Sequence, residues 1–419
     1  MIVQETYGKS IHCLRLPNHW LVILLAYHSA FAFIYGVQIM ADSQDYIVAA
    51  NDITAFIQSN HVIRTPGYPW FMSLLGNFYP LIICVQHGMA IALAWMFYTT
   101  LEQDMPRLAV VVFWVIGLHP WIAFWSCTIM TETLALFLLA ASLLALIKQK
   151  PHLAGFLVGL SILVRPSSLG AIPALLLGVW LIHHELKKVI QATVLCTLVI
   201  FPWILRNHNN AGTWSLSSVA GHTRWSRQAT VAGFHDSPWP EIGKVLKEKG
   251  ELEGDRYFMR RAMQTMVEHP AGTVVQFIRS AKGYTAYDLH LLVPSAEKAW
   301  TDSIRKNQLP MVGLKIFFQY LLPCLVWTIA IYGLWQERHQ ILFQLSGLYL
   351  CGLSIVVLLI GIGDTRLRMP SEIFLLILSS AGVLQLLESF RAKITTLAFM
   401  HGRRFELPAF AFLDRFQNR

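Results

Sequence analysis

The chain has 419 residues, of which 55% are hydrophobic and 14% are charged, and its net charge is +9. This composition excludes an ordinary soluble domain, whose core could not hold so much apolar surface, and is typical of a membrane protein with several spans. The Lys and Arg residues occur mostly in short segments between apolar runs, which favours a role in membrane orientation over nucleic-acid binding.

Apolar runs that are long enough to span, or nearly span, about 30 Å of hydrocarbon recur along the chain. They lie at 19–40, 70–101, 108–126, 133–147, 153–164, 169–183, 189–205, 311–335, 341–360 and 369–387. We therefore predict an all-α polytopic membrane protein with roughly ten transmembrane helices. The run at 70–101 is too long for one straight helix and contains Pro80, so we expect a short interfacial helix followed by a spanning one.

The basic residues between these runs predict the orientation. If the N-terminus is cytoplasmic, alternate connections are rich in Lys and Arg, as cytoplasmic segments usually are. These connections contain Lys9, Arg15, Arg107, Lys148, Lys150, Lys187, Lys188, Arg338, Arg391, Lys393, Arg403 and Arg404. We expect both termini to be cytoplasmic and the loop after the first apolar run to face outward.

A long polar segment at 206–310 is placed on the outer side by the same rule. Helical spacing of apolar residues within it predicts a mainly helical domain, with helices at 240–249, 256–269 and 272–284. The chain is accordingly divided into an N-terminal transmembrane module (1–205), this outer domain (206–310), C-terminal transmembrane helices (311–390) and a basic cytoplasmic tail (391–419).

Charged residues at the outer edge form the candidate site. The first outer loop (41–69) carries Asp42, Asp45 and Arg64. Later runs contribute Glu132, Arg165, Arg206, Arg366 and Arg368. Arginines here oppose the orientation rule, and an anionic ligand such as a phosphate would account for them, because guanidinium groups bind phosphate oxygens in pairs. Structural ion pairs of Asp42 with Arg64 and of Glu132 with Arg165 account for them equally well.

Several short motifs occur in an order that resembles a known superfamily. They are Asp42-Ser43-x-x-Tyr46, Arg64-x-Pro66-Gly67-Tyr68-Pro69, Thr131-Glu132-Thr133-Leu134, Val164-Arg165-Pro166, Arg206-Asn207 followed by Gly212 and Ser217-Ser218, and Arg366-x-Arg368-x-Pro370. From Asp42 to about Pro370 the chain resembles the GT-C superfamily of membrane glycosyltransferases. Within it, the chain is most similar to the bacterial branch of the protein O-mannosyltransferase and lipid A aminoarabinose transferase group.

The resemblance implies an inverting glycosyltransferase of a bacterial inner membrane with a periplasmic active site. Its donor would be a single sugar on a polyprenyl phosphate, and its acceptor a lipid A, glycan or protein group outside. Asp42 falls on the family's catalytic base. Arg64 lies close to the family's phosphate-binding lysine, and Arg366 and Arg368 match its last outer loop, which implies that they bind the donor phosphate. The remaining site-lining residues are Asp45, Tyr46, Tyr68, Glu132, Arg165 and Arg206.

No cofactor is expected. A divalent metal held by Asp42 and Asp45 would follow the oligosaccharyltransferase branch, but the outer loops lack a clear further acidic pair, so metal is not favoured. Two other functions remain open at this point. Intramembrane charges also mark transport paths, so the chain could be a transporter or flippase of lipid-linked sugars. It could also be a polymerase or ligase of lipid-linked glycans, which uses a diphosphate-linked donor.

Overall fold

The computed structural model describes residues 18–234, 237–287, 309–360 and 365–400, and the regular elements in these ranges are helices. Extended backbone pairs within these ranges at one isolated parallel bridge, between Gln38 and Thr128. The prediction of an all-α protein is confirmed for this part of the chain.

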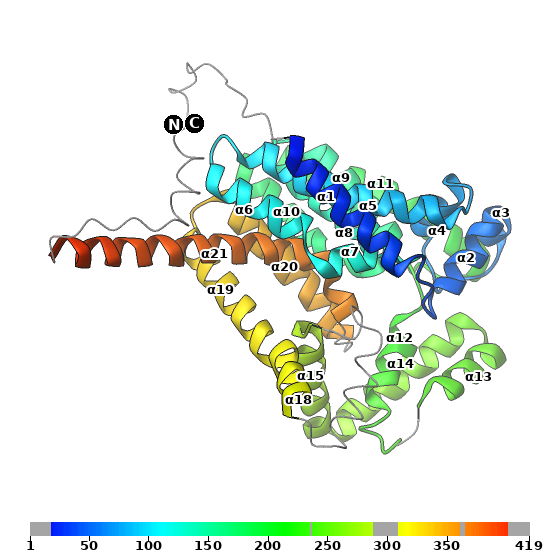
Figure 1. Cartoon of the computed structure of the whole chain (residues 1–419). Helices are drawn as coiled ribbons and strands as arrows, with labels where there is room; N and C mark the ends of the chain where they lie inside the picture. Colours follow the sequence, from blue (N-terminus) through cyan, green and yellow to red (C-terminus); the bar gives the residue numbers. More distant parts are fainter. Residues whose placement is uncertain (1–17, 235–236, 288–308, 361–364, 401–419) are drawn as a thin grey trace.

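The helices fall into three consecutive groups (Figure 1). The first group comprises α1 (Asn18–Tyr35), α2 (Ser43–Asn51), α3 (Ile53–Gln58), α4 (Gly67–Leu74), α5 (Tyr79–Leu101), α6 (Pro106–Gly117), α7 (Pro120–Ser126), α8 (Glu132–Ile147), α9 (Pro151–Val164), the 3-10 helix η1 (Pro166–Gly170), α10 (Ala171–His183) and α11 (Leu186–Ala211). The second comprises α12 (Ala220–Gln228), α13 (Trp239–Lys249), α14 (Glu251–Glu268) and α15 (Pro270–Thr285). The third comprises α18 (Leu309–Ile316), the π-helical turn η2 (Phe317–Leu321), α19 (Leu322–Gln336), α20 (Ile341–Ile360) and α21 (Thr365–Met400).

Six helices in the described ranges are long and apolar enough to cross a membrane, and the pair α6 and α7, bent by 47°, would make a seventh. The protein is therefore a multi-pass membrane protein by helix length and composition. The ten predicted runs all coincide with helices, but α8 and α9 have only 16 and 14 residues, fewer than the roughly 20 that a straight span needs. The count of ten spans stays a prediction. The 70–101 run is divided into α4 and α5, as its length predicts.

Two of the connections predicted to be cytoplasmic, those after α5 and after α19, lie beside the later part of α21. Arg107, at the start of α6, lies 2.9 Å (Nη1 to Oε1) from Glu388 of α21. Gln385 of α21 also donates to the carboxylate of Glu337, which follows α19. The short helices α2, α3 and α4 lie at the opposite end, on the right of Figure 1. These contacts join two of the connections predicted to be cytoplasmic to the later part of α21, and the orientation itself stays a prediction.

Small residues let the transmembrane helices approach closely. A Cβ on Gly170 of η1 would lie 2.4 Å from the carbonyl oxygen of Gly352 on α20, so a side chain cannot be placed at this crossing. Such contacts between small residues are typical of helix packing in membranes, where lipid is as apolar as the side chains and close van der Waals packing drives association. The crossing fixes α20 beside η1, and both elements contribute to the site described below.

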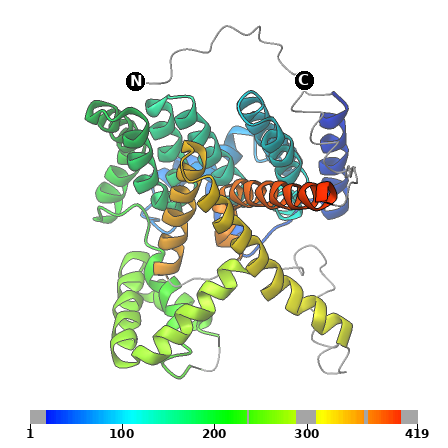
Figure 2. The ribbon, with the colours of Figure 1, turned by 90° about the vertical axis from the view of Figure 1, so that its left-hand side faces the viewer.

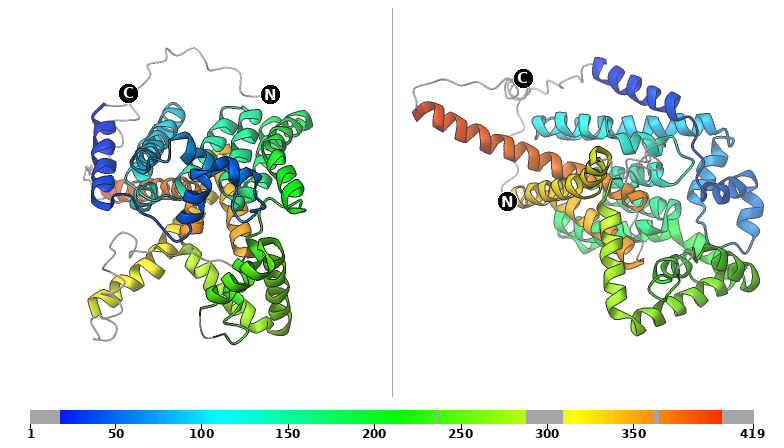
Figure 3. Two further views of the ribbon diagram at one scale, coloured as in Figure 1. Left: turned by 90° about the vertical axis from the view of Figure 1, so that its right-hand side faces the viewer. Right: turned by 60° about the horizontal axis from the view of Figure 1, so that its bottom comes forward.

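Helices α12 to α15 form a group apart from the main body of transmembrane helices (Figures 2 and 3). Trp225, Ile242 and Phe258 are buried together and join α12, α13 and α14. Helices α13, α14 and α15 lie close to the three positions that the sequence predicts, whereas α12 was not predicted. Helix α11 continues to Ala211, so the predicted boundary at 206 lies inside a helix, and α21 similarly continues beyond 391.

Candidate active site

Six charged side chains from segments far apart in the sequence form one continuous series of ion pairs. Its order is Asp45, Arg64, Asp42, Arg366, Glu132 and Arg165. Arg64 Nη2 lies 2.9 Å from both Asp45 Oδ2 and Asp42 Oδ1. Arg366 Nη2 lies 2.6 Å from Asp42 Oδ2, and its Nε lies 3.1 Å from Glu132 Oε1. Arg165 Nη1 is 2.8 Å from the same Glu132 oxygen. We call these six residues the charge chain.

Five separate segments contribute to the charge chain, and local backbone structure explains how three of them reach it. Asp42 and Asp45 lie three residues apart at the start of α2, so both carboxylates face the same side and can reach Arg64. Glu132 is the first residue of α8. Arg165 precedes Pro166 and has extended backbone (φ −148°), the conformation that a following proline favours, which ends α9 at this point.

A close backbone contact brings the Arg64 segment to Arg165. A Cβ on Gly67, the first residue of α4, would lie 2.6 Å from the backbone nitrogen of Val164 at the end of α9. Only glycine allows the start of α4 to approach the end of α9 this closely. The segments that carry Arg64 and Arg165 are thereby held together by backbone packing as well as by charge.

The charge chain passes from partly exposed to fully buried groups. The side chain of Asp42 is 33% exposed, whereas that of Glu132 is 0% exposed and that of Arg165 is 8% exposed. Burial by itself would raise the pKa of Asp42, but the guanidinium groups of Arg366 and Arg64 outweigh burial and hold the pKa below its ordinary value. Asp42 is therefore an ionised acceptor at neutral pH.

A cavity of about 530 Å³ lies over the exposed part of the charge chain. Asp42, Arg64, Arg165 and Arg366 line one side of it. The other lining residues comprise apolar residues of η1, α20 and α21, the segment before α12, and polar residues of α12 and α13. They include Leu169, Leu216, Val356, Val357, Leu367, His222, Thr223, Ser226, Arg227 and Trp239. A volume of this size, with apolar walls and a few convergent charges, is typical of a ligand site.

The structure places the predicted site-lining aromatics differently. Tyr46 lines the cavity, and the Arg64 guanidinium lies 5.2 Å from the centre of its ring. Tyr68 is fully buried behind Tyr46, and its hydroxyl donates to Gln86 Oε1 at 3.0 Å. Asp45 and Glu132 do not line the cavity but bind the arginines that do.

Arg368 does not line the cavity, although the resemblance implies that it binds the donor phosphate. Helix α21 begins at Thr365, so Arg366 and Arg368 are on its first turn and point in directions about 200° apart. Arg368 Nε donates to Glu372 Oε2 at 2.7 Å, and its Nη1 donates to backbone carbonyls at the end of α15, including Tyr284 at 3.1 Å. Arg368 therefore joins the end of α15 to α21.

We expect Arg368→Met to destabilise the protein by about 3–5 kcal/mol, because it leaves the buried carboxylate of Glu372 without its cation. Glu372 is 0% exposed. Thermal unfolding of the purified protein in detergent measures the loss, with Arg260→Met on the exposed face of α14 as the control. An unfolding temperature equal to that of the control would contradict this structural role.

Arg206 also lies outside the cavity, which does not match its predicted site-lining position. It is near the end of α11, where Nη2 donates to the carbonyl of Phe56 and Nη1 to the carbonyl of His61, at 2.7 and 2.6 Å. The guanidinium stacks on Trp203 at 4.4 Å. Its contacts hold the segment between α3 and α4 in place.

Arg227 is a cavity residue that sequence reasoning missed. It lies on α12, and its guanidinium has no ion pair or hydrogen bond with the residues that the structure describes. The charge chain contains three arginines and three carboxylates, so it is neutral in sum, and Arg227 is the lining arginine that adds positive charge to the cavity. Helix α12 is short and polar, and Arg227 itself belongs to none of the motifs, so no sequence signal pointed to it.

The carboxylates of the charge chain are bound by guanidinium groups. Within the described ranges, no group of three His, Cys, Asp or Glu residues is arranged to hold a metal ion. Asp42 is bound on both oxygens, so a divalent ion would have to displace Arg64 and Arg366 to use it. Comparisons with family models, with curated proteins and with solved structures found no match to this chain.

Proposed function

We propose that this protein is an inverting glycosyltransferase of the GT-C type. It moves a single sugar from a polyprenyl-phosphate donor to an acceptor on the outer side of a bacterial inner membrane, with both termini in the cytoplasm and the site facing the periplasm. The acceptor is a hydroxyl or amine of lipid A, of a surface glycan or of a protein. No nucleic acid takes part.

The observation that carries this proposal is the position of Asp42 between two guanidinium groups on the wall of a cavity. Arg64 and Arg366 each bind one of its oxygens, at 2.9 and 2.6 Å. A carboxylate beside paired arginines supplies both components that the transfer requires, a group that accepts a proton and cations that stabilise a departing phosphate. A purely structural ion pair has no need of a cavity over it.

The donor phosphate would compete with Asp42 for the two arginines. In this proposal its oxygens take over hydrogen bonds from Arg64 and Arg366, because guanidinium groups bind phosphate and carboxylate in the same bidentate way. Asp42 then loses part of the stabilisation that lowers its pKa and becomes a stronger base. Donor binding thereby activates the group that the next step uses.

In the transfer step, Asp42 takes the proton from the acceptor hydroxyl while the acceptor oxygen forms a bond to the anomeric carbon. The bond from that carbon to the phosphate oxygen breaks, and its electron pair remains on the lipid phosphate. Attack from the face opposite the leaving phosphate inverts the configuration. Arg64 and Arg366 stabilise the growing negative charge more than they stabilise the bound donor, which is how they would lower the barrier.

The apolar part of the cavity suits a lipid donor. Leu169 of η1 and Val356 of α20 line it, and Ile355 and Leu359 on the same end of α20 are 55% and 60% exposed. A polyprenyl chain could lie against these side chains while its phosphate meets the charge chain. Helices α12 and α13 cover the site from the other side and would contact the acceptor.

We expect Arg227→Gln to raise the donor KM by roughly tenfold, because a hydrogen bond to a charged group contributes about 1.5–3 kcal/mol. The charge chain is neutral in sum, and the bound donor, a phosphodiester, adds one negative charge to the cavity. The guanidinium of Arg227 lies where it can balance that charge. Initial rates at varied donor concentration measure the change. Arg256→Gln, exposed on α14, removes the same charge outside the cavity. Equal KM values for the two variants would remove Arg227 from donor binding.

A deletion strain tests the proposed function in the cell. Loss of the protein should leave polyprenyl monophosphate carrying one sugar in the lipid extract and remove a sugar from a surface lipid, glycan or protein. Wild-type protein should restore both, and Asp42→Asn should restore neither. A deletion strain with unchanged lipid-linked sugars and unchanged surface glycosylation would contradict the proposal.

A further inference from the structure

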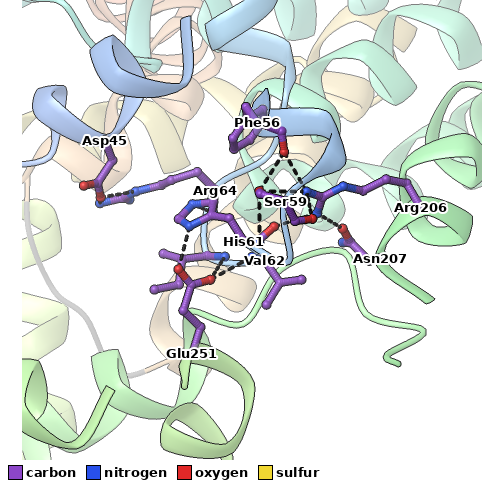
Figure 4. A network of polar contacts seen from close by, with 10 residues as sticks. Asp45, Phe56, Ser59, His61, Val62, Arg64, Arg206, Asn207 and Glu251 are labelled. Carbon is purple, nitrogen blue, oxygen red and sulfur yellow. Dashed lines mark hydrogen bonds and ion pairs between the residues drawn. The ribbon is translucent and has the colours of Figure 1, made fainter. Parts of the chain in front are cut away.

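The segment between α3 and α4, residues 59–66, carries Arg64 to the charge chain but has no regular secondary structure of its own. Its backbone groups therefore need partners from elsewhere. Arg206 and Asn210, at the end of α11, bind carbonyl groups at the start of the segment, including that of Ser59 at 2.7 and 3.0 Å. Figure 4 shows Arg206 reaching these groups from one side.

Glu251 holds the same segment from the other side. It is the first residue of α14, and its carboxylate lies beneath the segment in Figure 4. Oε2 accepts hydrogen bonds from the backbone N–H of Val62 at 2.8 Å and of Ile63 at 3.3 Å, and Oε1 lies 2.6 Å from Nδ1 of His61. One side chain of the outer domain thus binds three consecutive residues that immediately precede Arg64.

The contact between Glu251 and His61 determines which nitrogen of the imidazole ring carries the hydrogen. An ionised carboxylate can only accept, so Nδ1 of His61 carries a proton. In the neutral ring, Nε2 then has a free lone pair, and it accepts the backbone N–H of Arg64 at 3.2 Å. His61 therefore transmits the position of Glu251 directly to the backbone of Arg64, whose side chain reaches Asp42.

We propose that Glu251 is a positioning residue, which acts through His61 to aim Arg64 at Asp42 and so makes assembly of the site depend on the outer domain. In this way α14 fixes the position of the backbone at residues 61–63. That backbone in turn fixes the position of the Arg64 guanidinium in the charge chain. The kinetic consequence rests on the proposed function, whereas the structural consequence does not.

The test compares Glu251→Ala and His61→Ala with Glu253→Ala, an exposed glutamate two positions further along α14. Without any donor, hydrogen exchange of a peptide covering 59–66 should become about tenfold faster or more in Glu251→Ala, because two amides lose a charged acceptor. Exchange of peptides from α5 should stay unchanged. Exchange at 59–66 equal to that of Glu253→Ala would overturn the inference.

The kinetic arm uses the polyprenyl-phosphate sugar from the deletion strain. Glu251→Ala and His61→Ala should each lower kcat/KM by about tenfold to a hundredfold, as misplaced binding groups do. Since Glu251 acts on Arg64 through His61, the double variant should be no worse than the more impaired of the two single variants. Strictly additive losses, or wild-type kinetics in Glu251→Ala, would also overturn the positioning role.

The two arms separate this inference from the proposed function. If the wild-type protein transfers no sugar, the proposed function fails, and the exchange of 59–66 alone decides the role of Glu251. If the wild type transfers sugar but Glu251→Ala equals Glu253→Ala in both arms, the positioning role fails and the proposed function stands.

Discussion

Asp42→Asn should reduce sugar transfer by about 10²–10⁴-fold while the protein still accumulates in the membrane, because the amide cannot take the proton from the acceptor. Asparagine has nearly the shape of aspartate and keeps one oxygen that can accept a hydrogen bond from Arg64 or Arg366. The side chain of Asp42 is one-third exposed, so the substitution leaves no deeply buried charge without a partner. Rates of transfer by purified variants, normalised to folded protein, give the effect.

Asp45→Asn is the matched control for this substitution. Asp45 lies on the same turn of α2 and binds the same Arg64, but its side chain is 48% exposed and does not line the cavity. We expect a small loss, within about tenfold, from weaker positioning of Arg64. If Asp42→Asn retained more than about a tenth of the wild-type rate, the base would have to be another group.

Arg366→Gln should lower kcat/KM by about 10²–10³-fold, because one cation that stabilises the departing phosphate is lost. The substitution also breaks the charge chain at its centre, since Arg366 joins Asp42 to Glu132. Arg338→Gln provides the control, because Arg338 is exposed near the opposite ends of the helices. Loss of activity in both variants to the same extent would argue against a local effect.

The same variant should change the pH dependence of kcat/KM. In the free protein, Arg366 and Arg64 hold the pKa of Asp42 below its ordinary value, so the carboxylate stays ionised and the ion pairs persist until the pH falls through that lowered pKa. Removing Arg366 raises the pKa of Asp42, so the acidic limb of the profile should move to higher pH. An acidic limb that does not move, or moves to lower pH, would show that Asp42 does not control it.

The helices could be predicted from sequence because long apolar runs have few alternatives in a membrane. The break between α4 and α5 was also predictable, since a run of this length cannot be one straight span. The candidate charges were found because arginines at the predicted outer ends of helices oppose the orientation rule. Both ion pairs that the sequence left open, Asp42 with Arg64 and Glu132 with Arg165, are present in the structure.

What the sequence could not give is the direction of each side chain. Arg366 and Arg368 look equivalent as neighbours in a loop, but the start of α21 at Thr365 sends one to the cavity and the other to Glu372. The motif pattern predicted that Arg206 lines the site. Its guanidinium instead donates hydrogen bonds to backbone carbonyl groups. Only the phase of a helix and the course of an irregular segment decide these directions.

Two residues could not be found from the sequence for a different reason. Arg227 lies on a short polar helix, and Glu251 meets His61 across 190 positions of the chain. Neither position belongs to a periodic apolar pattern or to a motif, so their roles depend on how α12 packs over the charge chain and how α14 packs against the α3–α4 segment. Long-range packing of this kind has no local signal.

The most direct test of the account is the mass of the lipid product. Purified protein, reconstituted in lipid, should be incubated with lipid extract from the deletion strain together with the acceptor fraction of that strain. We predict that polyprenyl monophosphate carrying one sugar disappears, that bare polyprenyl monophosphate replaces it, and that Asp42→Asn prevents the change. A sugar that remains on its lipid, as a transporter or flippase would leave it, would contradict the account, and so would release of polyprenyl diphosphate, as a glycan polymerase or ligase produces.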